Sequence, residues 1–217
     1  MTRTPRGAGR PTAPLLTEDR ILQAAFRLTR ERTPRQFTMT ALAEALGVRT
    51  SALYHHFANR DAVIRAMRGR ISAMIDDGWQ QSDDLARTLE SWGHAYRSAM
   101  LAAPGAIVML ATLPIDEDAS SFAQYEHVTR LMTAAGWPAD KAADAIIAIE
   151  SFVIGSALDA LAPADNMSPG ALAESFPAFA DAERRRAAAS DDPARRTFAI
   201  GLTALIHGLG HWATRSD

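Results

Sequence analysis

The chain has 217 residues, of which 47% are hydrophobic, and a formal net charge of −2, so it can form one large or two small domains with a substantial core. It contains no cysteine, which excludes disulfides, thiolate catalysis and Cys-ligated zinc or iron–sulfur sites. Uncharged apolar runs such as "AIVMLATLPI" are too short for a membrane span, and the basic N-terminus lacks the apolar segment of a secretory signal. These features predict a cytoplasmic protein.

Charge is distributed unevenly along the chain. Residues 1–70 hold 13 arginines and five acidic residues, a net charge of +8, whereas residues 71–217 hold ten basic and twenty acidic residues, a net charge of −10. A basic N-terminal third attached to an acidic remainder indicates a polyanion-binding module joined to a second unit. Chance clustering of arginine is the alternative explanation.

Apolar residues recur at helical spacing and no strand pattern is convincing, which predicts an all-α fold. Residues 1–16 combine Pro, Gly and Arg without periodicity and are expected to form a flexible basic arm. Thr17, Thr38 and Asn59 are suitable N-caps, and Gly47 is a suitable helix stop. The first third is therefore predicted to hold helices at about 17–31, 38–46, 50–56 and 59–76.

The remaining two thirds are also predicted to be helical, with breaks at Pro- and Gly-containing segments. Residues 163–193 are rich in Ala, Pro, Asp and Ser and are expected to be a mobile loop with one or two helical turns. The expected helices lie at about 83–102, 105–112, 119–135, 139–161 and 195–214.

The second and third predicted helices form a helix-turn-helix pattern, "TMTALAEALGVRTSALYHHFANRD". Ala43 is small where the two helices would cross, Gly47 lies at the turn, and Val48 and Leu53 can fill the core. The third helix would then be free to lie in the DNA major groove.

The exposed face of this short helix is rich in hydrogen-bonding groups. Base edges are expected to meet Thr50, Ser51 and His55, with Ala52 against a thymine methyl. Phosphates are expected to meet Thr38 and Thr40, at a helix N-terminus, and Tyr54, His56 and Arg60. The alternative is a helical domain on which these groups are merely solvated. A metal site at His55 and His56 is not expected, because adjacent helical positions diverge by about 100° and no third ligand is near.

The segments "RILQAAFRLTRE" and "FTMTALAEALGVRTSALYHHFANRDAVIRAM" resemble the N-terminal domain of the tetracycline-repressor (TetR) family, over about residues 18–70. The resemblance implies a homodimeric repressor of a pseudopalindromic operator, released from DNA by a small organic effector. It also implies that "RGAGRP" is a DNA-binding arm. The implied DNA contacts are Thr38, Thr40, Arg49, Thr50, Ser51, Ala52, Tyr54, His55, His56 and Arg60.

Two helical segments near the C-terminus are apolar on more than one side, "ADAIIAIESFVIGSALDAL" and "FAIGLTALIHGLGHW". Two such helices per subunit suit an isologous four-helix dimer interface; a monomer core is the alternative. His207 and His211 are expected to be interface histidines rather than metal ligands. The expected organisation is a helix-turn-helix DNA-binding domain at 17–62, a linker helix to about 76, and a ligand-binding and dimerisation domain at 77–217.

Residues 92–160 resemble, more weakly, the C-terminal domain of the tetracycline repressors, which implies a ligand cavity between helices. Met109 stands where those repressors have a metal-coordinating histidine, and Leu113 replaces an arginine. Because a thioether is a poor Mg²⁺ ligand, no metal and no cofactor are expected, and the effector is expected to be uncharged or weakly polar. Ordinary core packing is the alternative for each candidate lining residue: His94, Tyr96, Met100, Met109, Leu113, Phe122, Tyr125, Val128, Met132, Trp137 and Phe152.

Two other functions are compatible with parts of the sequence. An all-α enzyme would need an acid–base site, for which the candidates are His94, Asp116, Glu117, Asp118 and His127, but no catalytic spacing motif supports it. A nonspecific DNA-coating protein would not need the apolar C-terminal domain. The sequence therefore favours a DNA-binding regulator and not an enzyme.

Overall fold

The computed structural model describes residues 16–75, 77–81, 84–116 and 118–215, and every regular element within them is helical. This confirms the predicted all-α fold. In chain order the elements are α1 Glu18–Glu31, α2 Met39–Leu46, α3 Thr50–Tyr54, α4 Arg60–Ser72, η1 Asp77–Gln81, α5 Leu85–Ala102, η2 Pro104–Ala106, α6 Ile107–Ala111, α7 Ala119–Ala134, α8 Ala139–Asp159, η3 Gly170–Leu172, α9 Pro177–Ala188 and α10 Pro193–Ala213. None of these helices combines the length and apolar character that a membrane span requires.

Helices α1, α2 and α4 begin at the predicted caps. The side chains of Thr17, Thr38 and Asn59 each accept a hydrogen bond from a backbone N–H three residues later, which satisfies one of the free donors at a helix start. Gly47 ends α2 in the left-handed conformation, with φ of 66°. Its N–H donates to Glu44 and the N–H of Val48 donates to Ala43, the hydrogen-bond pattern of a Schellman cap.

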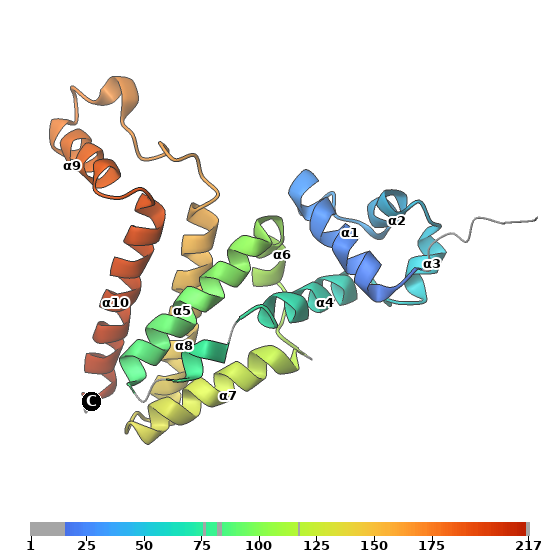
Figure 1. Ribbon diagram of the computed structural model, residues 1–217, viewed down its shortest axis with the longest axis horizontal. Helices are drawn as coiled ribbons and strands as arrows, with labels where there is room; N and C mark the ends of the chain where they lie inside the picture. Colours follow the sequence, from blue (N-terminus) through green and yellow to red (C-terminus); the bar gives the residue numbers. More distant parts are fainter. Residues whose placement is uncertain (1–15, 76, 82–83, 117, 216–217) are drawn as a thin grey trace, which may run out of the picture.

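The first three helices and the start of α4 form an N-terminal head around one core. Ile21, Leu42, Leu53 and Val63, one from each helix, are fully buried there. Helix α4 then leaves the head and extends to the body, where it packs against α5, α6 and α7 (Figure 1). A single helix thus contacts both parts of the molecule.

The body is a bundle in which α8 contacts α5, α7 and α10. Its core includes Trp92, Val128, Ile149 and Leu202, all completely buried. Helices α8 and α10 run side by side at the edge farthest from the head (Figure 1). Their outward faces are therefore available for a contact with another molecule.

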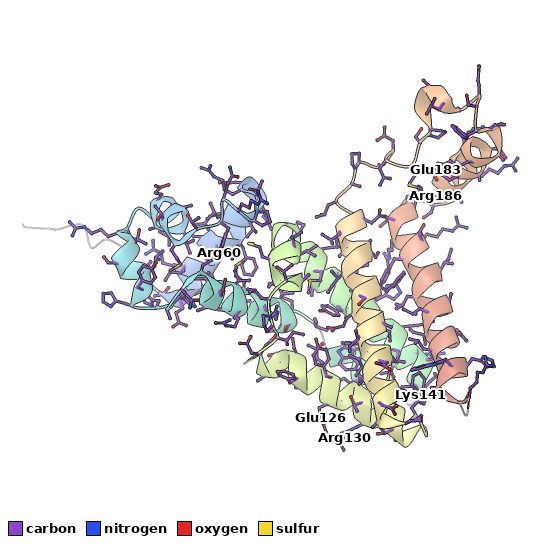
Figure 2. The ribbon with its side chains drawn as sticks, turned by 180° about the vertical axis from the view of Figure 1, so that it is seen from behind. Arg60, Glu126, Arg130, Lys141, Glu183 and Arg186 are labelled. Atoms are coloured by element: carbon purple, nitrogen blue, oxygen red, sulfur yellow. The ribbon has the colours of Figure 1, made fainter. Side chains whose placement is uncertain are left out.

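Residues 163–193 differ from the prediction, because this segment contains the 12-residue helix α9 as well as η3. Helix α9 stands away from the bundle (Figure 1) and has no buried residue. Ion pairs one turn apart support it instead, Asp181 with Arg185 and Glu183 with Arg186 (Figure 2). The Pro and Asp content of this segment therefore does not prevent a helix. Helix α3 also differs from the prediction, because it ends at Tyr54, two residues before the predicted end.

Candidate functional site

The outer surface of α3 collects most of the residues that were predicted to contact DNA. Leu53 faces the core and is completely buried, which turns the remaining side chains of this short helix outward. Tyr54 is 53% exposed. Arg49, Ser51 and His55 are also exposed, whereas Thr50, Ala52 and His56 are partly exposed.

The N-terminus of α2 lies beside this surface. Thr38 and Thr40 are both exposed, and the Thr38 hydroxyl accepts a hydrogen bond from the Ala41 N–H at 3.1 Å. This bond leaves the hydroxyl hydrogen of Thr38 free to donate to an anion. The expected arm falls on residues 1–15, outside the described residues.

Arg60 is the exception among the expected DNA contacts, because its guanidinium is held by the protein itself (Figure 2). Its Nε donates to the Phe37 carbonyl at 2.8 Å and its Nη2 donates to the Pro34 carbonyl at 3.1 Å. Its Nη1 pairs with Asp61 at 3.3 Å. Arg60 therefore braces the loop that precedes α2, a role that its position in the motif did not indicate.

A cavity of about 170 Å³ lies between α4, α5, α6, α7 and α8. Four of the residues expected to line a ligand pocket are in its wall: Tyr96, Met100, Leu113 and Tyr125. The complete wall comprises Arg68, Ser72, Tyr96, Met100, Ile107, Leu110, Ala111, Leu113, Ile115, Ser121, Tyr125, Glu150 and Ile154.

The other expected pocket residues lie elsewhere. Four of them are buried and belong to the hydrophobic core: Met109, Val128, Met132 and Trp137. The sequence could not separate them from the cavity wall, because wall and core residues lie on the same apolar helix face. The remaining three are outside this cavity: Phe122 is 53% exposed, His94 packs edge-on against Phe198, and Phe152 lines a groove of about 430 Å³ on the side of α8 and α10. Burial, followed by the charge of Arg195, lowers the pKa of His94.

The polar residues of the cavity wall were missed by the sequence analysis. The Tyr125 hydroxyl donates to Oε1 of Glu150 at 2.5 Å, and Tyr96 also hydrogen-bonds to Glu150. Burial raises the pKa of the Glu150 carboxyl, and the two tyrosine hydrogen bonds only partly oppose this shift. Burial and then Glu150 itself raise the pKa values of both tyrosines. A partly buried Glu in an otherwise apolar helix, in the segment "AIIAIESFVIG", was the available signal.

Arg68 connects α4 to the end of α6. This buried side chain donates to the carbonyls of Leu110 and Leu113 at 2.5 and 2.7 Å, and also to the carbonyl of Pro114. One turn further along α4, the Ser72 hydroxyl donates to Asp118 at 2.9 Å, at the start of α7. The cation of this group, Arg68, lies at the C-terminal end of α6, where the helix dipole favours a positive charge.

The residues of the alternative acid–base site are not assembled into one centre. His94 contacts Phe198, Asp116 faces Arg65, Asp118 binds Ser72, and His127 lies edge-on to Trp79. Glu117 lies outside the described residues. Within the described part of the chain, no group of three or more His, Asp or Glu side chains is arranged to hold a metal ion.

Comparisons with known proteins agree along nearly the whole chain. The family model "Bacterial regulatory proteins, tetR family" matches residues 21–67, and "Tetracyclin repressor-like, C-terminal domain" matches residues 78–212. An HTH-type transcriptional regulator of Saccharopolyspora erythraea is 30% identical over 149 residues, which are 67% of this chain and 61% of that relative. The class A tetracycline repressor of transposon 1721 in Escherichia coli is 28% identical over 89% of this chain and 90% of its own length.

Solved structures share the fold. ActR of Streptomyces coelicolor in complex with (S)-DNPA matches with a TM-score of 0.70 and 23% identity, over 92% of this chain and 99% of that one. BioQ bound to its natural double-stranded DNA operator matches with a TM-score of 0.65 and 20% identity, over 91% of this chain and 99% of that one.

A helix-turn-helix head on an all-helical body with an internal cavity defines a DNA-binding transcriptional regulator of the bacterial type. The chain belongs to the TetR family, and its C-terminal part is of the tetracycline-repressor kind.

Proposed function

We propose that the protein is a homodimeric repressor that binds a pseudopalindromic operator through α3 and is released by a small organic effector in the cavity. The observation that carries the proposal is the path of α4, which begins beside α3 and carries Arg68 and Ser72 into the cavity wall. A ligand in that cavity would contact the helix on which the head is mounted. Effector control requires that the ligand bind the free and DNA-bound conformations with different affinity.

The proposed division of labour follows the fold. Residues 17–62 bind DNA, α4 links them to the body, and residues 77–217 bind the effector and the second subunit. The proposed DNA contacts are the α3 residues and the two threonines of α2, with Arg60 in a bracing role. Because its operator is chromosomal or plasmid DNA, we place the protein in the cytoplasm.

Specific DNA binding is tested by fluorescence anisotropy with the DNA upstream of the protein's own gene, using scrambled DNA as competitor. Specific binding should exceed nonspecific binding by about 10³-fold or more and weaken as salt rises. Equal affinity for both DNAs would support the coating function instead. Operators at other sites are covered by repeating the assay with pooled genomic fragments.

A matched pair of variants locates the DNA surface. Arg49→Ala on the head and Arg130→Ala on α7 both remove an exposed arginine. Arg49→Ala should reduce operator affinity and lower the salt slope by about one, whereas Arg130→Ala should leave both unchanged. Tyr54→Ala should weaken binding without unfolding the head, since its side chain is 53% exposed.

The proposed dimer interface is the outer face of α8 and α10. On this face Ile147 is 61% exposed, Ile200 is 60% exposed and Trp212 is 37% exposed. A Cβ atom added at Gly208 meets no atom within 4 Å in one subunit, so the backbone position is open. We expect Gly208→Arg to keep the subunit fold and to obstruct a partner. We expect the wild type at twice 23.4 kDa by light scattering and Gly208→Arg as a monomer with weakened operator binding. A monomeric wild type would refute the dimer.

A further inference from the structure

The cavity between α4 and α8 contains one guanidinium and one carboxyl, Arg68 and Glu150, in a wall that is otherwise apolar or hydroxylic. The positive charge of Arg68 is directed to the three carbonyls at the end of α6. No ion pair to Glu150 exists among the described residues, and its hydrogen-bond partners are the two tyrosine hydroxyls. The carboxylate therefore has hydrogen-bond donors but no cation in ion-pair contact, and Arg68 acts on it only at longer range.

A second carboxyl lies behind the same wall. Asp118 is buried and accepts hydrogen bonds from Ser72 at 2.9 Å and Ser121 at 2.6 Å, and both serines line the cavity. The cavity wall and the layer directly behind it thus hold two carboxyl groups and a single buried guanidinium. With all three ionised, the cavity region carries an excess negative charge, and a buried charge is stable only when it is paired.

The size and the other walls of the cavity limit what can supply the missing cation. A volume of about 170 Å³ is close to that of cavities that hold a benzene-sized molecule, about 150 Å³. Tyr96 and Tyr125 place two aromatic rings at Glu150, and aromatic rings attract a cation within about 6 Å. Met100, Leu110 and Ile154 provide the apolar remainder of the wall.

We propose that this cavity binds a small arylalkyl amine in its protonated form, with the Glu150 carboxylate as counterion and the rings of Tyr96 and Tyr125 beside the ammonium group. The ammonium N–H groups would donate hydrogen bonds to a carboxylate already oriented by the Tyr125 hydroxyl, and the aryl group would occupy the apolar side near α6. This ligand class replaces the uncharged effector that the sequence analysis favoured. The role of such an amine as an effector rests on the proposed repressor function, whereas the binding of the amine to the cavity does not.

The test is isothermal titration calorimetry of the full-length protein with three probes of equal size: benzylamine, benzyl alcohol and benzoate. The wild type should bind benzylamine about 10-fold or more tightly than benzyl alcohol, because hydrogen bonds to a charged group contribute more than neutral ones. Equal affinities for the two, tightest binding of benzoate, or no binding of benzylamine at millimolar concentration would each overturn the proposal.

Two variants and a control assign the effect to the carboxylate. Glu150→Gln should remove the preference for the amine, while Glu126→Gln, an exposed carboxyl on α7 (Figure 2), should retain it. Tyr125→Phe removes one hydrogen bond but no charge, so it should also retain the preference. Amine binding that persists in folded Glu150→Gln would refute the inference. The wild-type comparison decides the matter even when a variant does not fold.

Operator binding measured on the same samples separates the two proposals. Specific DNA binding without an amine preference would refute the amine inference alone. An amine preference without specific DNA binding would refute the repressor function alone.

Discussion

At the scale of single residues, Arg60 shows how a side chain in a DNA-binding motif can serve the fold. Its guanidinium donates to the Phe37 and Pro34 carbonyls and lies 5.7 Å from the centre of the Phe37 ring. Arg60→Ala should therefore lower the free energy of unfolding by about 1–2 kcal/mol, because two hydrogen bonds of about 0.5–1.5 kcal/mol each are lost from a partly exposed site. Thermal unfolding measures this change, and Arg49→Ala is the control that should leave it unaltered. An unchanged melting temperature in Arg60→Ala would mean that Arg60 does not brace the head.

Glu150 gives the protein a defined pH dependence. Burial raises its pKa in the folded state, so the folded protein keeps this proton over a pH range in which the unfolded chain has lost it. The stability linked to this proton is complete below the unfolded pKa, about 4.3, and is lost as the pH rises through the folded pKa. The charge that faces the group is Arg68 on α4, and its hydrogen-bond partners Tyr96 and Tyr125 are neutral in this range.

Glu150→Gln should therefore unfold at a higher temperature than the wild type at about pH 8, and the difference should close as the pH falls towards about 4. Each kcal/mol gained corresponds to about 2–4 °C in a protein of this size. Glu126→Gln, whose carboxyl is exposed, should show no such pH-dependent difference. A variant less stable than the wild type at high pH would mean that the carboxylate already has a cationic partner.

At the scale of helices, the sequence predicted elements that have a side-chain cap or a buried apolar face and failed where a helix has neither. The caps at Thr17, Thr38 and Asn59 and the stop at Gly47 place the starts of α1, α2 and α4 and the end of α2 within one residue, because capping is decided by neighbouring residues. Helix α4, which has no such stop, ends at Ser72, about four residues before the predicted end. Helix α9 was missed because it has no buried face, and hydrophobic periodicity cannot detect such a helix.

The position of a side chain in the cavity wall is harder to predict from the sequence than its exposure on α3. The outward direction of α3 side chains follows from one buried residue, Leu53. The cavity wall, by contrast, is contributed by five helices, and only their packing decides that Tyr96 and Tyr125 face it while Val128 and Met132 do not. Arg68 and Glu150 were not predicted to line the cavity, because their position there depends on partners outside their own helices.

The contact between η2 and α1 is a second join between head and body. A Cβ atom placed on Gly105 would lie 1.8 Å from the Thr29 carbonyl oxygen, so only glycine permits this approach. Arg30 of α1 also donates to the Ala102 carbonyl at 3.4 Å. Gly105→Ala should destabilise the protein by about 1–3 kcal/mol, as overpacking does, and should separate the head from the body.

Gly69→Ala on α4 is the matched control for this substitution. Its added methyl would lie 4.0 Å from the nearest atom, Oδ1 of Asp118, an ordinary contact, and helix propensity favours alanine by up to about 1 kcal/mol. Denaturant unfolding should therefore show Gly69→Ala at or above wild-type stability and Gly105→Ala below it. Wild-type stability in Gly105→Ala would mean that α1 can shift without cost, and that α4 alone positions the head.

At the scale of the whole molecule, α4 is the element through which an event in the cavity can reach the DNA. It is fixed to α6 by Arg68 and to α7 by Ser72 and Asp118, and it reaches the head through Val63 and Ile64. In the proposed dimer, a ligand that displaces either attachment would change the position from which the two heads approach the operator. The spacing of the two heads, rather than a change in the side-chain contacts of α3, would then determine the affinity for the operator.

Arg68→Lys tests this coupling, because a lysine keeps the charge but cannot hold three carbonyls in a fixed geometry. In allosteric proteins a ligand typically changes affinity at the other site by about 5–150-fold. We expect the ratio of operator affinities with and without saturating benzylamine to fall towards one in Arg68→Lys, while each ligand still binds. Arg65→Lys, on the same helix and paired with Asp116 at 3.8 Å, should retain the wild-type ratio. An unchanged ratio in Arg68→Lys would assign the coupling to the contact between α1 and η2, which Gly105→Ala would then abolish.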